Sequence, residues 1–534
     1  VSTKIVKTNK IAIMKNVSPT STTTPSANWT KRVNMPNANA NAITTPVLMP
    51  SKKVFTRPSK PDSFPDWKPK RPWPNFTWPP SSTNKRKSVA SPRDMIARII
   101  LFVAASSLAA AKPNIVVLYS DDAGYADFGF QPNCAPEMIN LTPHIDRIAK
   151  AGARFTNAYM AGSVCSPSRA GLMTGRYQQR FGYDNNLPPG TKNGLELTET
   201  FGVKRLQKIG YKTGLIGKWH LGYPEAYHPN KRGFDWFYGL LQGSRPYFSQ
   251  EKISDHRVIQ ENGKNTKEGG YVTDRFGDAA CRFIKEHKEE PFYLFVSFTS
   301  PHGPLQPKPE DAARTAHIKE KKRANYAGLI VSLDDNVGKI LDCLKAQGLE
   351  KDTIVLFTND NGGQTSNGAI NAPLQGKKGT LWEGGIRVPW TMRWPDKIPA
   401  GLVVDKPVIA LDLLPTVIEA AKAQVDPAWK LDGKSFLSLI DGTPKTTTAT
   451  EAPRTLYWRQ GGSKGPRAMR EGKWKIIHDR KTGNAPALYD LESDIGESKD
   501  LSKEHAATLK AMLKKLDTWE FQLEEPRWGS GKSK

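Results

Sequence analysis

Three nearly uninterrupted apolar runs constrain the fold of this chain more than any other feature of its sequence. They cover residues 114–119, 291–298 and 353–357. Such runs are typical of strands that are buried on both faces of a sheet. Segments with apolar residues at helical spacing lie between them, at 200–210 and 325–348, and each ends at a glycine suited to a helix C-terminus. The alternation predicts an α/β sandwich, with a large mostly parallel or mixed sheet flanked by helices and functional side chains at the carboxyl ends of its strands.

The sequence changes character after about residue 445. Four short strand-like segments, at 454–459, 467–470, 473–478 and 487–490, are separated by glycine-containing turns, and a helical segment follows from about 502 to 521. This order predicts a smaller C-terminal antiparallel sheet with one packing helix. We therefore expect a main domain over 112–445 and a small α/β domain over 446–534.

The first 94 residues differ from the rest of the chain in composition. They hold 17 lysines and arginines but only three acids. This surplus of positive charges is more than half of the formal net charge of +26 on the 534 residues. Their Ser, Thr, Asn and Pro content, without periodicity, predicts a disordered basic extension or an over-extended gene model. A nucleic-acid-binding arm is disfavoured, because no folded binding element accompanies it. The remaining residues are moderately basic, which suits a polyanionic substrate.

A short apolar segment follows at 95–111. A methionine and an arginine precede its apolar run, which ends in three alanines, Ala109 to Ala111, of the kind that signal peptidases cleave. The run is too short for an ordinary transmembrane helix. It predicts a signal peptide and a secreted or periplasmic protein without stable membrane insertion. An apolar first element of the fold is the alternative.

Acidic and amide residues follow two of the three apolar runs. Asp121 and Asp122 come directly after the first run, and Asp360 and Asn361 come after the third. Carboxylates that meet at one edge of a sheet repel one another unless a cation lies between them. An all-oxygen set without histidine or thiolate favours calcium before magnesium. We predict one calcium ion at this edge, and a solvated turn is the alternative.

Basic residues follow two other strand-like segments. Lys218 and His220 stand two apart, and on an extended segment such residues point to the same side. His302 lies in a loop fixed by the prolines at 301 and 304. A lone lysine or histidine is usually a surface or core residue. Together these three side chains suit a site that binds an anion and transfers protons.

Cys165 begins the most specific motif. It opens Cys165-Ser-Pro-Ser-Arg169, which is followed by Thr-Gly-Arg at 174–176. An isolated cysteine here would be read as an ordinary buried side chain at a helix start. The motif resembles the Cys-x-Pro-x-Arg signature of the type I, formylglycine-dependent sulfatases of the arylsulfatase family, in the alkaline-phosphatase-like superfamily. The segments around Asp121, Lys218, His302, Asp360 and Lys378 resemble the same family in order. With only four cysteines, the chain has no disulfide framework.

The resemblance implies roles for these residues. A maturation enzyme oxidises Cys165 to formylglycine, which acts as the nucleophile with its charge stabilised by Arg169 and calcium. Lys218 contacts the nucleophile and the sulfate, His220 acts on the hydrated aldehyde, and His302 and Lys378 assist departure of the alcohol. The implied calcium ligands are Asp121, Asp122, Asp360, Asn361 and the oxygen at position 165. The family more often has serine at Asn359, and we expect no consequence because this side chain is not a ligand.

The substrate is less constrained than the reaction. Many sulfatases carry a histidine or serine that contacts sulfate near residues 242–248, where this chain departs from the pattern. Ser244 or Arg245 can fill that role, or Arg245 can bind a carboxylate or second sulfate of a sugar chain. We expect a sulfated carbohydrate as substrate. The alternatives are a phosphoester hydrolase on the same scaffold, disfavoured by the shortage of histidines near the acids, and a non-catalytic binder of sulfated glycans.

Overall fold

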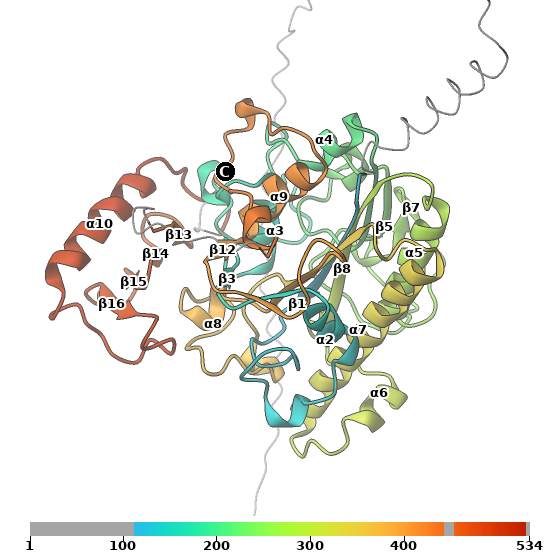
Figure 1. Ribbon diagram of the computed structural model, residues 1–534, viewed down its shortest axis with the longest axis horizontal. Coiled ribbons are helices and arrows are strands. Elements are labelled where there is room, and N and C mark those ends of the chain that lie inside the picture. Colours follow the sequence, from blue (N-terminus) through green and yellow to red (C-terminus); the bar gives the residue numbers. More distant parts are fainter. Residues whose placement is uncertain (1–111, 443–452, 530–534) are drawn as a thin grey trace, which may run out of the picture. The chain divides into compact units, whose positions relative to one another are not determined.

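The first apolar run forms β1 (Asn114–Asp121), a central strand of a ten-stranded sheet (Figure 1). The computed structural model describes residues 112–442 and 453–529, which belong to one compact unit of the chain. Every residue of β1 is buried. Val117 and Tyr119 pack into the core on one face of the sheet, whereas Val116 and Leu118 pack into the core on the other. Burial on both faces explains why this run is apolar almost throughout.

The sheet has a parallel centre and antiparallel additions. Its strand order is β11-β2-β10-β9-β1-β8-β4-β5-β6-β7, and the five strands from β9 to β5 are parallel. β10 is antiparallel to both of its neighbours, and β6 and β7 add an antiparallel edge. The other strands are β2 (Ala153–Phe155), β4 (Lys212–Lys218), β5 (Trp236–Leu240), β6 (Gln260–Glu261), β7 (Lys264–Asn265), β8 (Phe292–Pro301), β9 (Thr353–Asn359), β10 (Trp390–Arg393) and β11 (Leu402–Val404).

Helices cover both faces of this sheet, which confirms the predicted sandwich (Figure 1). On the Val117 face lie α3 (Cys165–Thr174), α4 (Val203–Lys208) and α9 (Leu413–Ala420). On the Val116 face lie α2 (Pro143–Lys150), α5 (Val272–Glu286) and α7 (Lys321–Ala346). The shorter α6 (Pro309–Arg314) packs on α7, and α8 (Glu383–Ile386) precedes β10. The helix expected over 200–210 is shorter in the structure, since Gly202 precedes its first turn.

The C-terminal part forms the predicted smaller antiparallel sheet with one helix. Its strands are β13 (Thr455–Arg459), β14 (Arg467–Glu471), β15 (Trp474–His478) and β16 (Ala487–Asp490), and α10 (Ala506–Glu520) packs on them. A two-stranded parallel sheet joins β3 (Ala158–Tyr159) to β12 (Val408–Ile409). The expected domain boundary near 445 and the segments at 1–94 and 95–111 lie outside the described residues. Within the described ranges, no helix is both long and apolar enough to cross a membrane.

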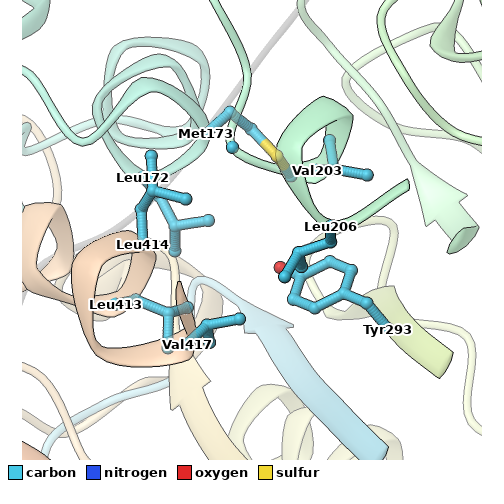
Figure 2. Close-up of a pocket in the computed structure, with 9 residues that line it drawn as sticks. Leu172, Met173, Val203, Leu206, Tyr293, Leu413, Leu414 and Val417 are labelled. Carbon is cyan, nitrogen blue, oxygen red and sulfur yellow. The ribbon is translucent and has the colours of Figure 1, made fainter. Parts of the chain in front are cut away.

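A small apolar cavity lies behind α3, between that helix and α4, α9 and β8 (Figure 2). Its volume is about 20 Å³, and its walls are aliphatic apart from one aromatic ring. Leu172 and Met173 of α3 face Val203 and Leu206 of α4 and Leu413, Leu414 and Val417 of α9, with Tyr293 from β8 and Gly202 completing the lining. The helix α3, which begins at Cys165, is therefore not fully packed on the side that faces this cavity.

Candidate active site

Four adjacent parallel strands, β9, β1, β8 and β4, carry the predicted site residues at one edge of the sheet. β1 ends at Asp121, β9 is followed directly by Asp360, β4 ends at Lys218, and His302 follows the last residue of β8. Cys165 is the first residue of α3, whose end is closed by Gly175 in the left-handed conformation. The predicted site residues thus meet at the carboxyl ends of the strands, as the sequence pattern leads us to expect.

Cys165 lies at the centre of this group. Its Sγ is 3.6 Å from Oδ1 of Asp121 and 3.9 Å from Oδ1 of Asp122, and it accepts a hydrogen bond from Nζ of Lys378 at 3.2 Å. The side chain is buried, and burial raises the pKa of the thiol to about 12. A thiol in this setting stays protonated at neutral pH and is a weak nucleophile without chemical conversion.

Three cations pair with three acids around the thiol. Lys218 Nζ is 2.6 Å from Asp121, and Lys378 Nζ is 2.6 Å from Asp122. The third pair joins the Arg169 guanidinium to Asp360 at 3.0 Å. Burial by itself lowers the pKa of the Lys218 ammonium, but the Asp121 carboxylate, Cys165 and Asp360 together outweigh it, so the pKa is raised. The cluster therefore holds three fixed cations, each balanced by an acid, in a region that water hardly reaches.

Arg169 is held from two sides. Its Nη1 donates to Oγ of Ser297 at 2.5 Å and to the carbonyl of Lys218 at 3.1 Å. Its guanidinium also lies over the ring of Tyr119, 5.2 Å from the centroid. These contacts fix the guanidinium in one orientation, so it can meet an anion without rearranging.

His220 lies on the buried side of the site. Its backbone has a positive φ of 61°, and its carbonyl accepts a hydrogen bond from Ser166 Oγ at 2.8 Å. A Cβ on Gly243 would lie 2.6 Å from the imidazole Cε1, so only glycine fits against this ring. Burial lowers the pKa of His220 well below its usual value, and the Lys218 charge lowers it further. Its Nδ1 is buried and has no hydrogen-bond partner among the described residues.

His302 lies on the open side. Its Nδ1 contacts the carbonyl of Gly303 at 2.8 Å, and its Nε2 is 3.4 Å from Oδ2 of Asp122. The side chain is 25% exposed, compared with 2% or less for the acids. A substrate that enters from solvent therefore meets His302 before it meets the buried cations.

The donor set fits a hard cation. Asp121, Asp122 and Asp360 are all buried, and burial together with the Asp121 charge raises the pKa of Asp360. Asn361 donates to Asp122 through Nδ2 at 2.9 Å, which leaves its buried Oδ1 without a partner. The ligand atoms of Asp121, Asp122, Cys165 and His302 lie within 4.8 Å of one another, so this group includes a histidine that the predicted ligand set did not contain and leaves out Asp360. Buried carboxylates beside an unsatisfied amide oxygen form the ligand chemistry that calcium prefers.

Sequence reasoning missed three residues that hold the site together. Ser297 fixes Arg169, and Ser166 fixes the backbone of His220 while it also contacts the hydroxyl of Tyr183 at 2.7 Å. The third is Asn359, for which no consequence was expected. Its Oδ1 accepts from Ser120 Oγ at 2.9 Å and from Ala123 N at 3.1 Å, and its Nδ2 donates to the carbonyls of Ala123 and Asn361. The carboxamide thus connects both acidic loops, a structural role that the expectation of no consequence did not include.

The substrate-binding assignment of Arg245 is also wrong. Its guanidinium is buried and forms two hydrogen bonds to the carboxylate of Glu268, at 2.7 and 3.2 Å. It donates in addition to the carbonyls of Pro246 and Arg257. Four of its five N–H donors are thus used within the protein, and the side chain is buried, so it is not presented to a sugar. Ser244 is half-buried, and its assignment stays a prediction.

Comparisons with known proteins agree with this arrangement. The family model described as Sulfatase matches residues 113–423, and the model described as N-sulphoglucosamine sulphohydrolase, C-terminal, matches residues 377–522. The chain is 32% identical to arylsulfatase J of Mus musculus over 462 residues, which cover 77% of this chain and 76% of that protein. It is also 32% identical to arylsulfatase A of Homo sapiens over 457 residues, which cover 76% of this chain and 86% of that protein.

The solved structures include a similar carbohydrate complex. Ps i-CgsB, in complex with k-i-k-neocarrahexaose, superposes with a TM-score of 0.73 at 37% sequence identity. The superposition covers 79% of this chain and 96% of that chain. The similarity therefore extends over nearly the whole of that structure.

Proposed function

This chain belongs to the sulfatase family and is a sulfuric ester hydrolase, and from that premise we propose that it removes sulfate from a sulfated polysaccharide or oligosaccharide. One observation carries the proposal: three fixed cations, Arg169, Lys218 and Lys378, surround Cys165 and its neighbouring acids. Such a site can neutralise the charge of a sulfate ester where water is largely excluded.

Two groups implied by the family complete the proposed site. A formylglycine derived from Cys165 would supply an oxygen nucleophile, and one calcium ion would supply positive charge beside it. The buried acids and the unpartnered Oδ1 of Asn361 support the calcium assignment. Its proposed ligands are Asp121, Asp122, Asp360, Asn361 and the oxygen at position 165. The conversion of Cys165 requires a formylglycine-generating maturation enzyme as a partner.

The three cations bind the sulfate group in this proposal. Lys218 and Arg169 approach from the buried side, and their hydrogen bonds to Asp121 and Ser297 hold them in place. Lys378 approaches from the side that is partly open to solvent. Charge that develops on the sulfate oxygens during the reaction then meets cations that need not move.

Two histidines transfer protons. His302 directs Nε2 toward the acids while Gly303 holds its Nδ1, so a proton on Nε2 can pass to the ester oxygen as the alcohol leaves. Lys378 stabilises the same oxygen. His220, whose Nδ1 has no partner, accepts a proton on the buried side and so allows sulfate to depart.

The carbohydrate class is supported by similarity and by charge. Ps i-CgsB, which is 37% identical to this chain, has been solved with a neocarrahexaose bound. The residues after 94, which are moderately basic, would attract a polyanionic chain. We also propose a secreted or periplasmic location, which rests on the signal-like sequence at 95–111.

The test is a product screen. Sulfated polysaccharides and their oligosaccharides are incubated with the calcium-loaded enzyme, and released sulfate is measured beside hydrolysis of 4-nitrophenyl sulfate and 4-nitrophenyl phosphate. We expect sulfate release from a sulfated sugar, its loss on calcium removal, and its loss in Cys165→Ala. Cys134→Ala, at a half-buried thiol outside the cluster, is the matched control.

Each alternative has its own outcome in the same screen. Faster turnover of the phosphate ester would favour the phosphoester hydrolase. Binding of sulfated glycans without any turnover, together with an unconverted Cys165 in peptide mass spectrometry, would favour the non-catalytic binder. Full activity in Cys165→Ala would contradict the nucleophile assignment.

A further inference from the structure

Arg257 lies beside the candidate active site and has no acidic partner among the described residues. It ends a short 3-10 turn, η5 (Asp255–Arg257), and its side chain is half-buried. Within the described part of the chain, its guanidinium forms no salt bridge and no hydrogen bond. A partly desolvated guanidinium with all its donors free is a ready binding group for an oxyanion.

A series of contacts connects Arg257 to His220. Gly243 packs against the His220 ring, and the preceding residue, Gln242, donates its backbone N–H to the carbonyl of His256 at 2.8 Å. The ring of His256 lies on that of Tyr223, with centroids 4.6 Å apart. Burial raises the pKa of the Tyr223 hydroxyl to about 12, and the positive charge of Arg257 lowers it in part.

Two buried polar atoms in this region have no hydrogen-bond partner among the described residues: the Tyr223 hydroxyl and Oε1 of Gln242. Polar atoms buried in this way are rare unless a ligand or water satisfies them.

We propose that Arg257, with the Tyr223 hydroxyl, binds a second anionic group of the substrate next to the sulfate that is cleaved. The inference rests on the proposed function, because it assumes a sulfate ester at Cys165. It narrows the substrate class to sugars that carry a further sulfate or carboxylate near the scissile ester.

Arg245 acquires a different role in this arrangement. Its Nη1 donates to the backbone carbonyl of Arg257 at 3.0 Å, while Glu268 and the Pro246 carbonyl accept from its other donors. The buried Arg245–Glu268 pair thus supports the turn that presents Arg257. Arg245 is a positioning residue, and the arginine available to the substrate stands twelve residues further along the chain.

The experiment compares matched pairs of sugars as competitors of 4-nitrophenyl sulfate hydrolysis. Kappa- and iota-carrageenan tetrasaccharides differ by one sulfate per disaccharide, and a chondroitin 4-sulfate disaccharide with its carboxylate intact or reduced tests the other anion. In the wild type we expect the more anionic member of one pair to inhibit about tenfold more strongly, as one charge-assisted contact allows. In Arg257→Ala that ratio should fall close to one, and Arg257→Lys should keep part of it.

Arg154→Ala is the matched control. Arg154 is a half-buried arginine on β2, several strands away from β5 in the large sheet. Its replacement should leave unchanged both the hydrolysis of 4-nitrophenyl sulfate and the ratio of inhibition within each pair of sugars. An unchanged ratio in Arg257→Ala, or equal inhibition within both pairs in the wild type, would overturn the proposal. If the wild type hydrolyses no sulfate ester, the proposed function fails instead, and calorimetric binding of the same four sugars still tests the subsite.

Discussion

The Asn359 carboxamide connects the two loops that carry the acidic side chains. It bonds Ser120 in β1, Ala123 just after β1 and the Asn361 carbonyl after β9, and it is fully buried. A serine at this position has one short hydroxyl and cannot reach partners on both loops at once. The asparagine thus sets the distance between Asp121 and Asp360, and with it the geometry available to a cation.

Replacing Asn359 should therefore weaken calcium binding as well as stability. Asn359→Ala leaves buried donors and acceptors unsatisfied, which we expect to lower the free energy of unfolding by about 1–3 kcal/mol. Calcium titration of the melting temperature should show a higher half-saturation concentration than in the wild type. Asn484→Ala, on an exposed turn, is the control. A titration curve that coincides with the wild type would contradict this role.

The site residues differ in how far sequence could predict them. Cys165, Arg169, Lys218 and His302 belong to short motifs at strand or helix ends, where the element itself determines the position. Arg245 was misassigned because the partner of an arginine depends on tertiary contacts, and Glu268 lies 23 residues away. Arg257 belongs to no recognisable sequence motif, so only the structure shows that its guanidinium has no partner among the described residues.

The same contrast holds for the elements of the fold. β1, β8 and β9 were predicted because burial on both faces requires long apolar runs. β2, β3 and β11 have only two or three residues, too few for any periodicity to be detected. Their pairing follows from tertiary contacts that the local sequence does not encode.

The cavity behind α3 offers a test of how packing supports the nucleophile helix. Val417→Ile adds one methyl group to a wall of this cavity, and we expect it to raise the free energy of unfolding by about 0.5–1 kcal/mol. Gly202→Ala should act in the opposite direction, because its Cβ would lie 1.6 Å from Cδ1 of Leu414. Both changes are measured by denaturant unfolding, with Val403→Ile on the surface as the control. Destabilisation by Val417→Ile would show that the cavity cannot accept the group.

At the scale of the whole molecule, the C-terminal sheet is joined to the catalytic loop by buried charges. Lys475 of β15 lies 2.8 Å from Glu383 and 2.7 Å from Glu497, and none of the three side chains is exposed. Glu497 also accepts the backbone N–H of Glu383, five residues after Lys378. The position of the Lys378 loop thus depends on a sheet that contributes none of the proposed catalytic residues.

Replacing Lys475 alone should lower the free energy of unfolding more than replacing Lys475 and Glu497 together. Lys475→Met leaves the buried Glu497 carboxylate without its cation, while Glu383 keeps Arg387 at 3.2 Å, and we expect a cost of about 3–5 kcal/mol in the free energy of unfolding. The double variant Lys475→Met, Glu497→Gln should recover part of that loss. Calorimetric melting of the four proteins forms a double-mutant cycle. Additive effects of the two substitutions would contradict a direct coupling.

The net charge of the molecule leads to a prediction about substrate encounter. A basic protein attracts a polyanionic chain over distances of about 10 Å at moderate ionic strength, and added salt shortens that reach. A small monoanionic ester interacts with far fewer charges. We therefore expect kcat/KM for a sulfated oligosaccharide to fall steeply as sodium chloride is raised, while kcat/KM for 4-nitrophenyl sulfate falls little.

The salt series separates this long-range effect from the local contact at Arg257. Arg257→Ala removes only one of the many cations carried by the residues after 94, so the slope of log kcat/KM against log salt should change little while the value for a doubly anionic sugar drops at every salt concentration. A sucrose series of matched viscosity is the control for diffusion. Equal salt dependence for the sugar and the aryl ester would mean that the basic surface does not guide the substrate, and the preference for a polyanion would then rest on the contacts at the site alone.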